Sequence, residues 1–245
     1  METNIHPKIS VITVSFNAVK EIEKTILSVL NQTYDNIEYI IIDGGSTDGT
    51  VDIIKKYADR LAYWVSEPDG GIYFGMNKGI KVATGEWINF MNAGDTFYDR
   101  NVIKDTFAQK YGAKIKIIYG KVYKKMADGS LTLLKSKSVS YMNRYIPFCH
   151  QAEFIKNYNK SEVSFQTEKY KLCADYDVAY RIYEKYGAIA FEKINNTIAI
   201  FDFTGASNTK GKQVFLENLN IRSHHKDIYW YWDNFKIKLK KFIGI

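Results

Sequence analysis

Acidic and amide side chains stand close behind four apolar runs of strand length in the first hundred residues. They are Asn17, Asp43, Asp69, Asn92 and Asp95. If the runs are parallel strands, their carboxyl ends meet at one edge of a sheet, where open α/β sheets bind ligands. The turn preferences of Asn and Asp explain any one position. The convergence of all five indicates a site.

The stretch 85–95 is the most informative of these. Its apolar part predicts a buried strand that stops at Asn92-Ala93-Gly94-Asp95. A carboxylate behind a glycine suits a magnesium or manganese ion that also binds substrate phosphates. The chain has no Gly-x4-Gly-Lys-Ser/Thr loop, and Gly44-Gly45 does not complete Gly-x-Gly-x-x-Gly. The sequence therefore predicts a nucleotide held by side chains, with its diphosphate bound through a divalent cation.

The elements that would position these residues alternate along the first half. Strand-length runs cover 9–16, 38–42, 61–65 and 87–91, and helical spacing of apolar residues follows the first three of them, the last helix covering about 72–82. This alternation predicts βαβ units and a mostly parallel sheet. Asn17 is expected to cap the first helix.

The second half is less regular. Its pattern predicts strands over 114–119 and 121–126, a turn at 127–130, a strand over 131–134, a helix opening at 173–177, and a hairpin of 189–194 with 197–201. The passage between 141 and 159 is rich in loop residues. No repeat or linker divides the chain.

Composition bounds the class of protein. The chain has 245 residues, of which 46% are hydrophobic, enough for one large domain or a domain with an appendage. No apolar run approaches the roughly 18 residues of a spanning helix. The N-terminal residues do not resemble a signal peptide, so a cytoplasmic protein is expected. Cys149 and Cys173 are expected as free thiols.

The net charge of +7 is concentrated in lysine-rich stretches at 110–137 and 226–241. Such stretches suit nucleic acid, anionic lipid or a phosphorylated substrate. The aromatic residues form no base-stacking module, which argues against nucleic acid. The segment 227–243 mixes aromatics with lysines, as interfacial membrane helices do. Packing of the same aromatics on the domain is an equal alternative.

Several motifs, in order, resemble the family-2 inverting glycosyltransferases with a GT-A fold. They are Val11 to Asn17, Ser28 to Tyr34, Ile42 to Thr50, Glu67 to Tyr73, Met76 to Gly79, Ala83 to Glu86 and Asn92 to Asp95. The set is similar to bacterial enzymes that build capsule, O-antigen or exopolysaccharide, including colanic acid. The resemblance covers about the first hundred residues.

The resemblance implies an α/β fold of GT-A type. A Rossmann-like, mostly parallel central sheet would be flanked by helices, with a smaller mixed region on the acceptor side. Residues 1–105 would bind the donor, 106–205 would bind the acceptor and carry the base, and 206–245 would form a helical, basic and aromatic appendage.

The resemblance also implies roles for single residues. Thr13, Ser15 and Asn17 would line the nucleotide pocket, and Asp43 would contact the nucleobase. Asp69 would lie near the ribose and diphosphate, with Tyr73 in the same motif. Asn77 and Lys78 would approach the donor phosphate or sugar, and Asp95 would bind the metal. Gly94 departs from the family pattern, which commonly has an acid there, and Asn92 is a possible substitute.

The second half would supply the catalytic base. An inverting transfer needs one because an acceptor hydroxyl is a weak nucleophile until its proton is taken. Ala174-Asp175-Tyr176-Asp177 resembles the family's element with Ala174 in place of an acid, so Asp175 is the first candidate and Asp177 the second. A helix N-cap role would also explain an aspartate here. His150 and Gln151 lie where relatives contact a sugar, although a lone loop histidine is commonly structural.

The expected function is transfer of a sugar from a nucleotide-diphosphate donor, UDP-linked in the first instance. The acceptor would be a saccharide or a polyprenyl-diphosphate-linked saccharide, the cofactor Mn²⁺ or Mg²⁺, and the place the cytoplasm or the cytoplasmic membrane face. A nucleotidyltransferase acting on sugar phosphates and a non-catalytic nucleotide- or carbohydrate-binding relative remain alternatives. The second is conceivable because acids are missing at Ala174 and Gly94.

Overall fold

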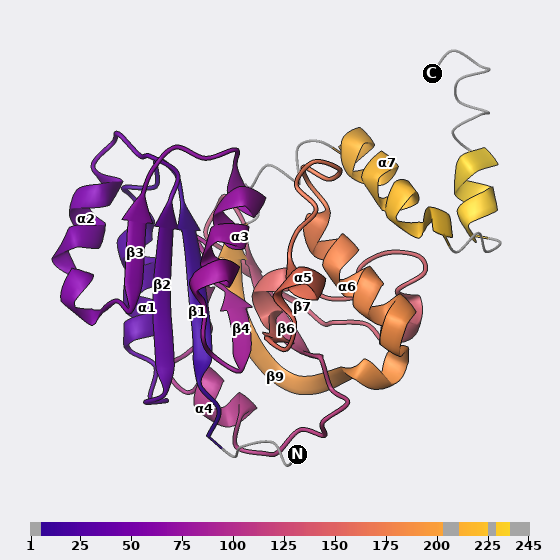
Figure 1. Ribbon diagram of the computed structural model, residues 1–245, viewed down its shortest axis with the longest axis horizontal. Coiled ribbons are helices and arrows are strands. Elements are labelled where there is room, and N and C mark those ends of the chain that lie inside the picture. The colour runs from indigo at the N-terminus through magenta and orange to yellow at the C-terminus, as the bar shows by residue number, and fades with distance from the viewer. Residues whose placement is uncertain (1–5, 203–210, 225–228, 236–245) are drawn as a thin grey trace.

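One nine-stranded sheet forms the centre of the molecule (Figure 1). The computed structural model describes residues 6–202, 211–224 and 229–235. The strand order is β3-β2-β1-β4-β8-β6-β9-β5, with β7 paired to β6. The strands are β1 (Ile9–Ser15), β2 (Ile37–Asp43), β3 (Tyr63–Ser66), β4 (Trp87–Phe90), β5 (Thr96–Phe97), β6 (Ile117–Lys125), β7 (Leu131–Leu134), β8 (Glu153–Lys156) and β9 (Phe191–Asp202).

Helices cover both faces of this sheet. They are α1 (Ile22–Leu30), α2 (Thr50–Lys56), α3 (Ile72–Val82), α4 (Val102–Thr106), α5 (Lys160–Val163), α6 (Ala174–Tyr186) and α7 (Gly211–Ile221). Apolar residues of α3 and α6 belong to one buried cluster. Those of α1, α2 and α4 belong to the cluster on the other face. The predicted helix over 72–82 is confirmed at both ends.

The first half of the sheet is parallel, as the sequence predicts. Strands β3, β2, β1 and β4 pair in parallel registers. Every residue of β1 is buried, with Ile12 and Val14 in one cluster and Ile9 and Val11 in the other. Burial on both faces explains why these strands read as continuous apolar runs. Their carboxyl ends therefore lie at one edge.

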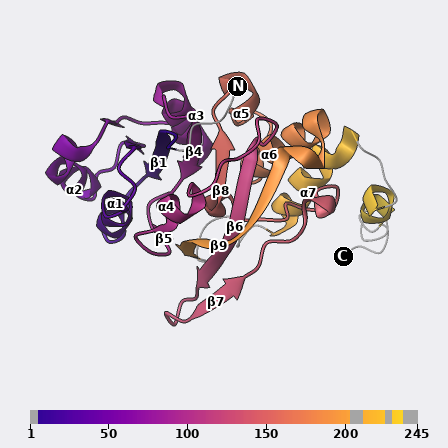
Figure 2. The same cartoon turned by 90° about the horizontal axis from the view of Figure 1, so that it is seen from below.

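The second half of the sheet is mixed. Strand β8 is antiparallel to both β4 and β6, whereas β6 and β9 are parallel. Figure 2 shows the β6–β7 hairpin extending beyond the rest of the sheet. The sheet runs without a break across the predicted division at 105, because β5 from the first half pairs with β9 from the second. The division into donor and acceptor halves stays a prediction about function.

Two strand predictions in this half are wrong. The parts of the runs 114–119 and 121–126 that are strand belong to the single strand β6, and the predicted hairpin around Asn195-Asn196 is the single strand β9. The register between β6 and β9 shifts on both sides of Lys121. Gly120 permits this irregularity, because a Cβ there would lie 2.6 Å from the Asn196 carbonyl oxygen. The turn at 127–130 and the strand β7 are confirmed.

Asn17 does not cap the first helix, which begins at Ile22 behind Glu21. Its backbone takes the left-handed conformation, with φ of 47°. Its amide oxygen accepts from the Thr47 N–H at 3.0 Å, and its own N–H donates to Ser46 Oγ at 2.7 Å. Asn17 therefore ties the end of β1 to the loop after β2.

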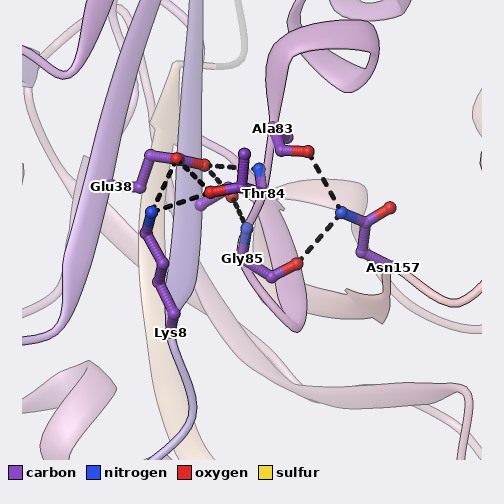
Figure 3. Close-up of polar contacts among 7 residues, drawn as sticks. Lys8, Glu38, Ala83, Thr84, Gly85 and Asn157 are labelled. Carbon is purple, nitrogen blue, oxygen red and sulfur yellow. Dashed lines mark hydrogen bonds and ion pairs between the residues drawn. The ribbon is translucent and has the colours of Figure 1, made fainter.

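A buried carboxylate ties the amino ends of β1 and β2 to the loop before β4 (Figure 3). Glu38 accepts hydrogen bonds from Ser10 Oγ at 2.6 Å, from the Thr84 N–H at 2.7 Å and from Lys8 Nζ at 2.9 Å. The Gly85 N–H donates to the same serine hydroxyl at 2.8 Å. The matched motif at 83–86 therefore lies at the sheet edge opposite to the predicted site.

Two expectations from the composition, on a membrane-spanning helix and on the cysteines, can be compared directly with the structure. Within the three ranges that the structure describes, no helix is both long enough and apolar enough to cross a membrane. Cys149 and Cys173 are free thiols, as expected.

Candidate active site

A pocket of about 350 Å³ opens at the carboxyl ends of the parallel strands. It brings together three of the predicted site residues, Ser15, Asp69 and Asn92. The rest of its lining is largely apolar or glycine: Val14, Phe16, Ala18, Gly44, Gly71, Ile72 and Ala93. The convergence expected from parallel topology is present at this edge.

Asp43, the last residue of β2, is fully buried beside this pocket. The hydroxyls of Ser15, Ser46 and Ser66 donate to its carboxylate at 2.6–2.8 Å, and the N–H groups of Gly45 and Ser46 donate at 3.1 and 2.8 Å. Burial alone raises the pKa of Asp43, but these donors outweigh burial and the pKa is lowered. Asp43 joins three strand ends. The contact of Asp43 with a nucleobase stays a prediction. It requires the carboxylate to exchange one of these hydrogen bonds for a bond to the base.

Asp69 lines the pocket and has one carboxylate oxygen without a hydrogen-bond partner. The Gly71 N–H donates to its Oδ1 at 2.8 Å. Its Oδ2 is buried and has no hydrogen-bond partner. Glycines leave room around the carboxylate: an added Cβ at Gly75 would lie 3.2 Å from Oδ2, and one at Gly44 would lie 3.4 Å from Oδ1. A buried acceptor without a partner suits a ligand hydroxyl or a cation.

The turn after β4 fixes Asp95 at the same edge. Gln151 Nε2 donates to Asp95 Oδ2 at 2.9 Å, and Thr25 Oγ1 donates to the Asp95 carbonyl oxygen at 2.7 Å. Gly94 adopts a φ of 103°, a conformation that favours glycine, and its N–H donates to Thr25 Oγ1 at 3.1 Å. This backbone requirement gives a physical reason for a glycine at this position.

The residues at this turn fit a metal ion only in part. Within the described parts of the chain, no group of three His, Cys, Asp or Glu side chains is placed to hold one. Asp95 offers a carboxylate, and Asn92 offers an amide oxygen that is buried without a hydrogen-bond partner. Magnesium and manganese often take one or two protein oxygens plus substrate phosphates and water. The residues therefore fit an ion that binds together with a nucleotide diphosphate.

A chain of polar contacts links this turn to helix α6. Asn92 Nδ2 lies 3.3 Å from His150 Nε2, and His150 Nδ1 lies 3.5 Å from Asp175 Oδ2. The Tyr73 hydroxyl lies within hydrogen-bond distance, 3.0 Å, of both Asp175 Oδ1 and the Leu172 carbonyl oxygen. Asp175, the first candidate base, and His150 therefore belong to one network. Tyr73 brings α3 into it.

The electrostatics of this network keep Asp175 ionised. Burial raises the pKa of Asp175, but the hydrogen bond and charge of His150 and the Tyr73 hydroxyl lower it more. Burial lowers the pKa of His150, whereas Asp175 and then Asp95 raise it, and the net shift is upward. The pKa of Tyr73 is raised by burial and by Asp175, so its hydroxyl keeps its proton.

Two predicted pocket residues of the first strand do not line the pocket. Thr13 is fully buried, and its hydroxyl donates to the Met91 carbonyl oxygen at 2.7 Å and lies 3.0 Å from the Tyr39 hydroxyl. Successive side chains of a strand point to opposite faces, so Thr13 and Ser15, two positions apart, share one face. Only Ser15, at the strand end, reaches the pocket. Asn17 lies beyond the end of β1 and forms hydrogen bonds with the loop after β2.

Asn77 and Lys78 are also outside the pocket lining. Both polar atoms of the Asn77 amide bond the Phe165 backbone, with distances of 2.9 and 2.8 Å. Lys78 Nζ pairs with Glu67 at 3.0 Å. Asn77 therefore positions the loop before α6. A donor contact by Lys78 stays a prediction.

Asp177 is not brought to the site. Its carboxylate pairs with Arg181 Nε at 2.9 Å on the buried side of α6. Burial raises the pKa of Asp177 despite the nearby guanidinium. Positions two apart on a helix face different directions. The geometry favours Asp175 alone as the base.

Two residues of the site were missed from the sequence. Phe16 lines the pocket with 65% of its surface exposed, and its position just before Asn17 at a strand end was the available signal. Glu153 is almost fully buried, with one carboxylate oxygen lacking a partner. Burial and the charge of Asp175 raise the pKa of Glu153 well above its ordinary value. No signal in the sequence pointed to Glu153, because it is a single acidic residue within a strand.

Solved structures similar to this chain are GT-A glycosyltransferases. TarS of S. aureus superposes with a TM-score of 0.67 and 17% identity over 92% of this chain and 41% of TarS. A mannosyltransferase of Pyrobaculum calidifontis, solved with GDP-Man and Mn²⁺, gives a TM-score of 0.62 and 14% identity over 91% of this chain and 66% of that one. Identities this low show the fold alone. The predicted fold class is confirmed.

The family can be assigned from the sequence comparison. The model of Glycosyl transferase family 2 matches residues 10–183, and the chain belongs to that family. A PGL/p-HBAD biosynthesis glycosyltransferase of Mycobacterium tuberculosis is 27% identical over 219 residues, 87% of this chain and 84% of that protein.

Two further matches are shorter. An uncharacterised glycosyltransferase of Mycobacterium tuberculosis is 44% identical over 98 residues, and the match spans 40% of this chain and only 37% of that relative. TuaG of Bacillus subtilis, a putative teichuronic acid biosynthesis glycosyltransferase, is 40% identical over 96 residues, 38% of each chain.

Proposed function

We propose that this protein transfers a sugar, with inversion, from a nucleoside-diphosphate donor to a saccharide or lipid-linked saccharide during assembly of a surface glycan. The relatives named for teichuronic acid and PGL biosynthesis support the pathway class. TarS has been solved with UDP and with UDP-GlcNAc, which supports a UDP-linked donor. The observation that carries the proposal is the ionised Asp175, held by His150 and Tyr73 next to the strand-end pocket.

The donor is proposed to occupy the strand-end pocket. Phe16 offers an exposed ring at its mouth, and aromatic rings stack well on nucleobases. Asp69 offers its unpartnered oxygen to a ribose hydroxyl or to a cation on the diphosphate. When bound at Asp95 and Asn92, a divalent cation would neutralise the charge that develops on the departing diphosphate.

Asp175 is proposed to take the proton of the acceptor hydroxyl as that oxygen attacks the anomeric carbon. One bond forms from the acceptor oxygen to the sugar, the bond to the diphosphate breaks, and the proton ends on the carboxylate. His150 and Tyr73 fix the orientation of Asp175, which reduces the entropic cost of reaching the reactive geometry. The raised pKa of Glu153 favours its neutral form, which disfavours a second negative charge beside Asp175.

A peripheral membrane contact is proposed for the C-terminal part of the chain. The helical residues 229–235 are anchored by Trp230 Nε1, which donates to the Leu219 carbonyl oxygen at 3.2 Å, and by Asp233, which pairs with the buried Arg222 at 3.0 Å. Tyr231, Trp232 and Phe235 remain more than half exposed. Segments 225–228 and 236–245, which contain the lysines of the stretch 226–241, lie outside the described residues.

The test compares Asp175→Asn with Asp177→Asn, measuring nucleoside-diphosphate release from UDP- and GDP-linked sugars with Mn²⁺ or Mg²⁺ and a lipid-linked acceptor extract. We expect Asp175→Asn to lose at least about 100-fold in turnover, the scale of a lost general base, and to keep its affinity for the nucleotide. Asp177→Asn should retain turnover. Near wild-type turnover in Asp175→Asn would reject the base. Nucleotide binding without release from any donor would reject the transferase function.

A further inference from the structure

Helix α7 packs against α6 and against the turn that leads into α6 (Figure 1). The Tyr170 hydroxyl in this turn donates to Asn220 Oδ1 at 2.9 Å, and Cys173 Sγ lies 3.7 Å from the Val214 carbonyl oxygen. The match to the family model ends at residue 183, so α7 lies outside the matched residues. Neither the proposed donor pocket nor the network around Asp175 accounts for this contact.

Glu217 of α7 directs its carboxylate at the backbone of the turn. The N–H groups of Leu172 and Cys173 donate to its Oε2 at 2.9 and 3.0 Å, and the Lys171 N–H donates to its Oε1 at 3.3 Å. Gln213, one helical turn before Glu217, donates to the same Oε1 at 2.9 Å and so holds the carboxylate in place. Hydrogen bonds to an ionised acceptor are stronger than those between neutral groups.

The beginning of α6 has no capping side chain of its own. Its N-cap residue is Cys173, whose side chain forms no capping hydrogen bond. Ser, Thr, Asp or Asn commonly supplies an acceptor at this position. Glu217 supplies a carboxylate from another helix instead, at the end of α6 where the helix dipole favours negative charge. The backbone that leads to Asp175 is therefore tied to α7.

One peptide group connects Glu217 to Tyr73. The peptide between Leu172 and Cys173 donates its N–H to Glu217, and its carbonyl oxygen lies 3.0 Å from the Tyr73 hydroxyl. This group is planar and trans, so its N–H and C=O point in opposite directions and move together. A rotation that breaks the bond to Glu217 therefore also moves the carbonyl away from Tyr73.

The Tyr73 hydroxyl divides its contacts between this peptide and the candidate base. It lies 3.0 Å from the Leu172 carbonyl oxygen and 3.0 Å from Asp175 Oδ1, but it has only one proton to donate. The place of the carbonyl oxygen therefore affects how the hydroxyl is directed toward Asp175. Asp175 follows Cys173 by two residues, so the same peptide also sets where its backbone enters α6.

We propose that Glu217 is a positioning residue for the base. It fixes the peptide between Leu172 and Cys173, and through this peptide and Tyr73 it fixes the orientation of the Asp175 carboxylate. This rests on the proposed function, which assigns Asp175 as the base. Glu217 does not line the strand-end pocket, so its loss should slow transfer without weakening donor binding.

Turnover per donor-binding site separates positioning from stability. Calorimetric titration with UDP and Mn²⁺ counts the folded, binding-competent sites in each preparation, and kcat is expressed per site. We expect Glu217→Ala to lower this kcat at least about tenfold, because small misplacements of a reacting group are costly. Its donor KM and UDP affinity should stay within about twofold of the parent. Glu217→Gln keeps an oxygen for the two N–H groups, so its kcat should stay within about threefold of the parent.

Glu184→Ala is the matched control, because it removes the same charge from an exposed position on α6. It should leave kcat per site unchanged. Unchanged kcat in Glu217→Ala would overturn the proposal, as would an equal loss in the control. An equal loss in Glu217→Gln and Glu217→Ala would also overturn it, because the hydrogen bonds to the peptide would then not be the cause.

Glu217→Asp replaces Glu217→Ala if the alanine variant binds no UDP. Its carboxylate is one methylene short of the peptide, so kcat per site should fall while Glu217→Gln remains near the parent. Parent-like kcat in Glu217→Asp would then overturn the proposal.

A double-mutant cycle tests the route through Tyr73. Tyr73→Phe removes the hydroxyl, so the loss of kcat caused by Glu217→Ala should shrink to less than about threefold in that background. An equal loss in both backgrounds would reject the route through Tyr73 and with it the proposal.

Amide hydrogen exchange provides an arm that needs no turnover. The N–H groups of Leu172 and Cys173 should exchange at least about tenfold faster in Glu217→Ala than in the parent, since their bonds to a charged acceptor are lost. In Glu184→Ala they should exchange as in the parent. Absence of donor turnover in the parent would reject the proposed function, and the exchange rates would still decide whether Glu217 holds this peptide. Parent turnover together with unchanged exchange in Glu217→Ala would reject this inference alone.

Discussion

Three aspartates of the site differ in how many hydrogen-bond donors reach them. Asp43 has five donor contacts and no exposed surface. Asp69 has one occupied oxygen and one buried oxygen without a partner. Asp175 faces a histidine and a tyrosine. The same side chain therefore serves as a structural tie, as an available ligand acceptor, and as a candidate base.

The pH dependence of activity should report the contact between His150 and Asp175. Because His150 lowers the pKa of Asp175, the acid limb of kcat/KM should lie below the ordinary range of an aspartate. In His150→Gln the positive charge is gone, so the pKa of Asp175 should rise and the acid limb should move to higher pH. The measurement is kcat/KM against pH for the parent and the variant.

His6→Gln is a suitable control for that profile. His6 is a partly exposed histidine that pairs with Asp35 at 2.7 Å, away from α6. Its loss should leave the acid limb where it is. An acid limb that stays in place in His150→Gln would contradict a positioning role for His150.

At the scale of elements, one carboxylate secures each end of the parallel strands. Asp43 joins the carboxyl ends of β1, β2 and β3, and Glu38 joins the amino ends of β1 and β2 to the loop before β4. Both are buried, and both have lowered pKa values because donors outweigh burial. Fixed ends hold the strand-end loops, and hence the pocket, in one geometry.

Stability should depend on Glu38 in a pH-dependent way. Burial raises the pKa of Glu38, but Ser10, Thr84 and Lys8 lower it to about 2 from 4.5. A lowered pKa in the folded state stabilises the fold above pH 4.5, and this contribution is lost as pH falls toward 2. The shift corresponds to about 3 kcal/mol. We expect Glu38→Gln to lose roughly this amount at pH 7 in urea unfolding, and to show a shallower fall of stability between pH 5 and 3.

The exposed Glu184→Gln provides the comparison, since no hydrogen bond or ion pair is found for that side chain. It should unfold as the parent does at each pH. If Glu38→Gln kept the parent's slope between pH 5 and 3, the ionised Glu38 would not be what ties this end of the sheet.

The close approach at Gly85 belongs to the same tie. An added Cβ would lie 2.5 Å from the Ser10 backbone nitrogen and 2.8 Å from the Lys8 carbonyl oxygen. Backbone must move to accept it, so Gly85→Ala should cost at least about 2 kcal/mol of unfolding free energy. Gly112→Ala meets no atom within 4 Å and should change stability by less than about 0.5 kcal/mol. Equal urea midpoints for the two variants would contradict the packing argument.

At the scale of the whole molecule, the strand ends and the C-terminal helices lie toward the same side in Figure 1. Tyr231, Trp232 and Phe235 of the last of these helices are more than half exposed, and their membrane contact stays a proposal. The β6–β7 hairpin provides a second exposed apolar group. This arrangement is consistent with a lipid-linked acceptor.

Membrane contact can be measured by co-sedimentation with vesicles. The parent protein should bind vesicles of phosphatidylglycerol and phosphatidylcholine more tightly than vesicles of phosphatidylcholine alone, because the chain is basic. The triple variant Tyr231→Ser/Trp232→Ser/Phe235→Ser should lose at least about tenfold in affinity, since aromatic burial in the interface is removed. Far-UV circular dichroism checks that helix content is kept. Equal binding by parent and triple variant would reject this surface.

The sequence by itself determined the parallel half of the fold and the edge at which the site lies. Strands buried on both faces produce unbroken apolar runs, and parallel strands must end together, so local pattern was sufficient. This is why Asp69 and Asn92 could be placed from their positions in the chain, whereas Ser15 came from the family resemblance.

Only the tertiary structure decided which polar residues are free to act. The hydrogen bonds of Thr13 and Asn77 come from residues distant in sequence, which no local pattern reveals. The same is true of the network from Asn92 through His150 to Asp175, which joins three separate segments. Asp177 pairs with Arg181 one helical turn away, and that i,i+4 spacing could have been read from the sequence. A residue's type and spacing state what chemistry it can do. The partners that the fold brings to it decide whether that chemistry is available.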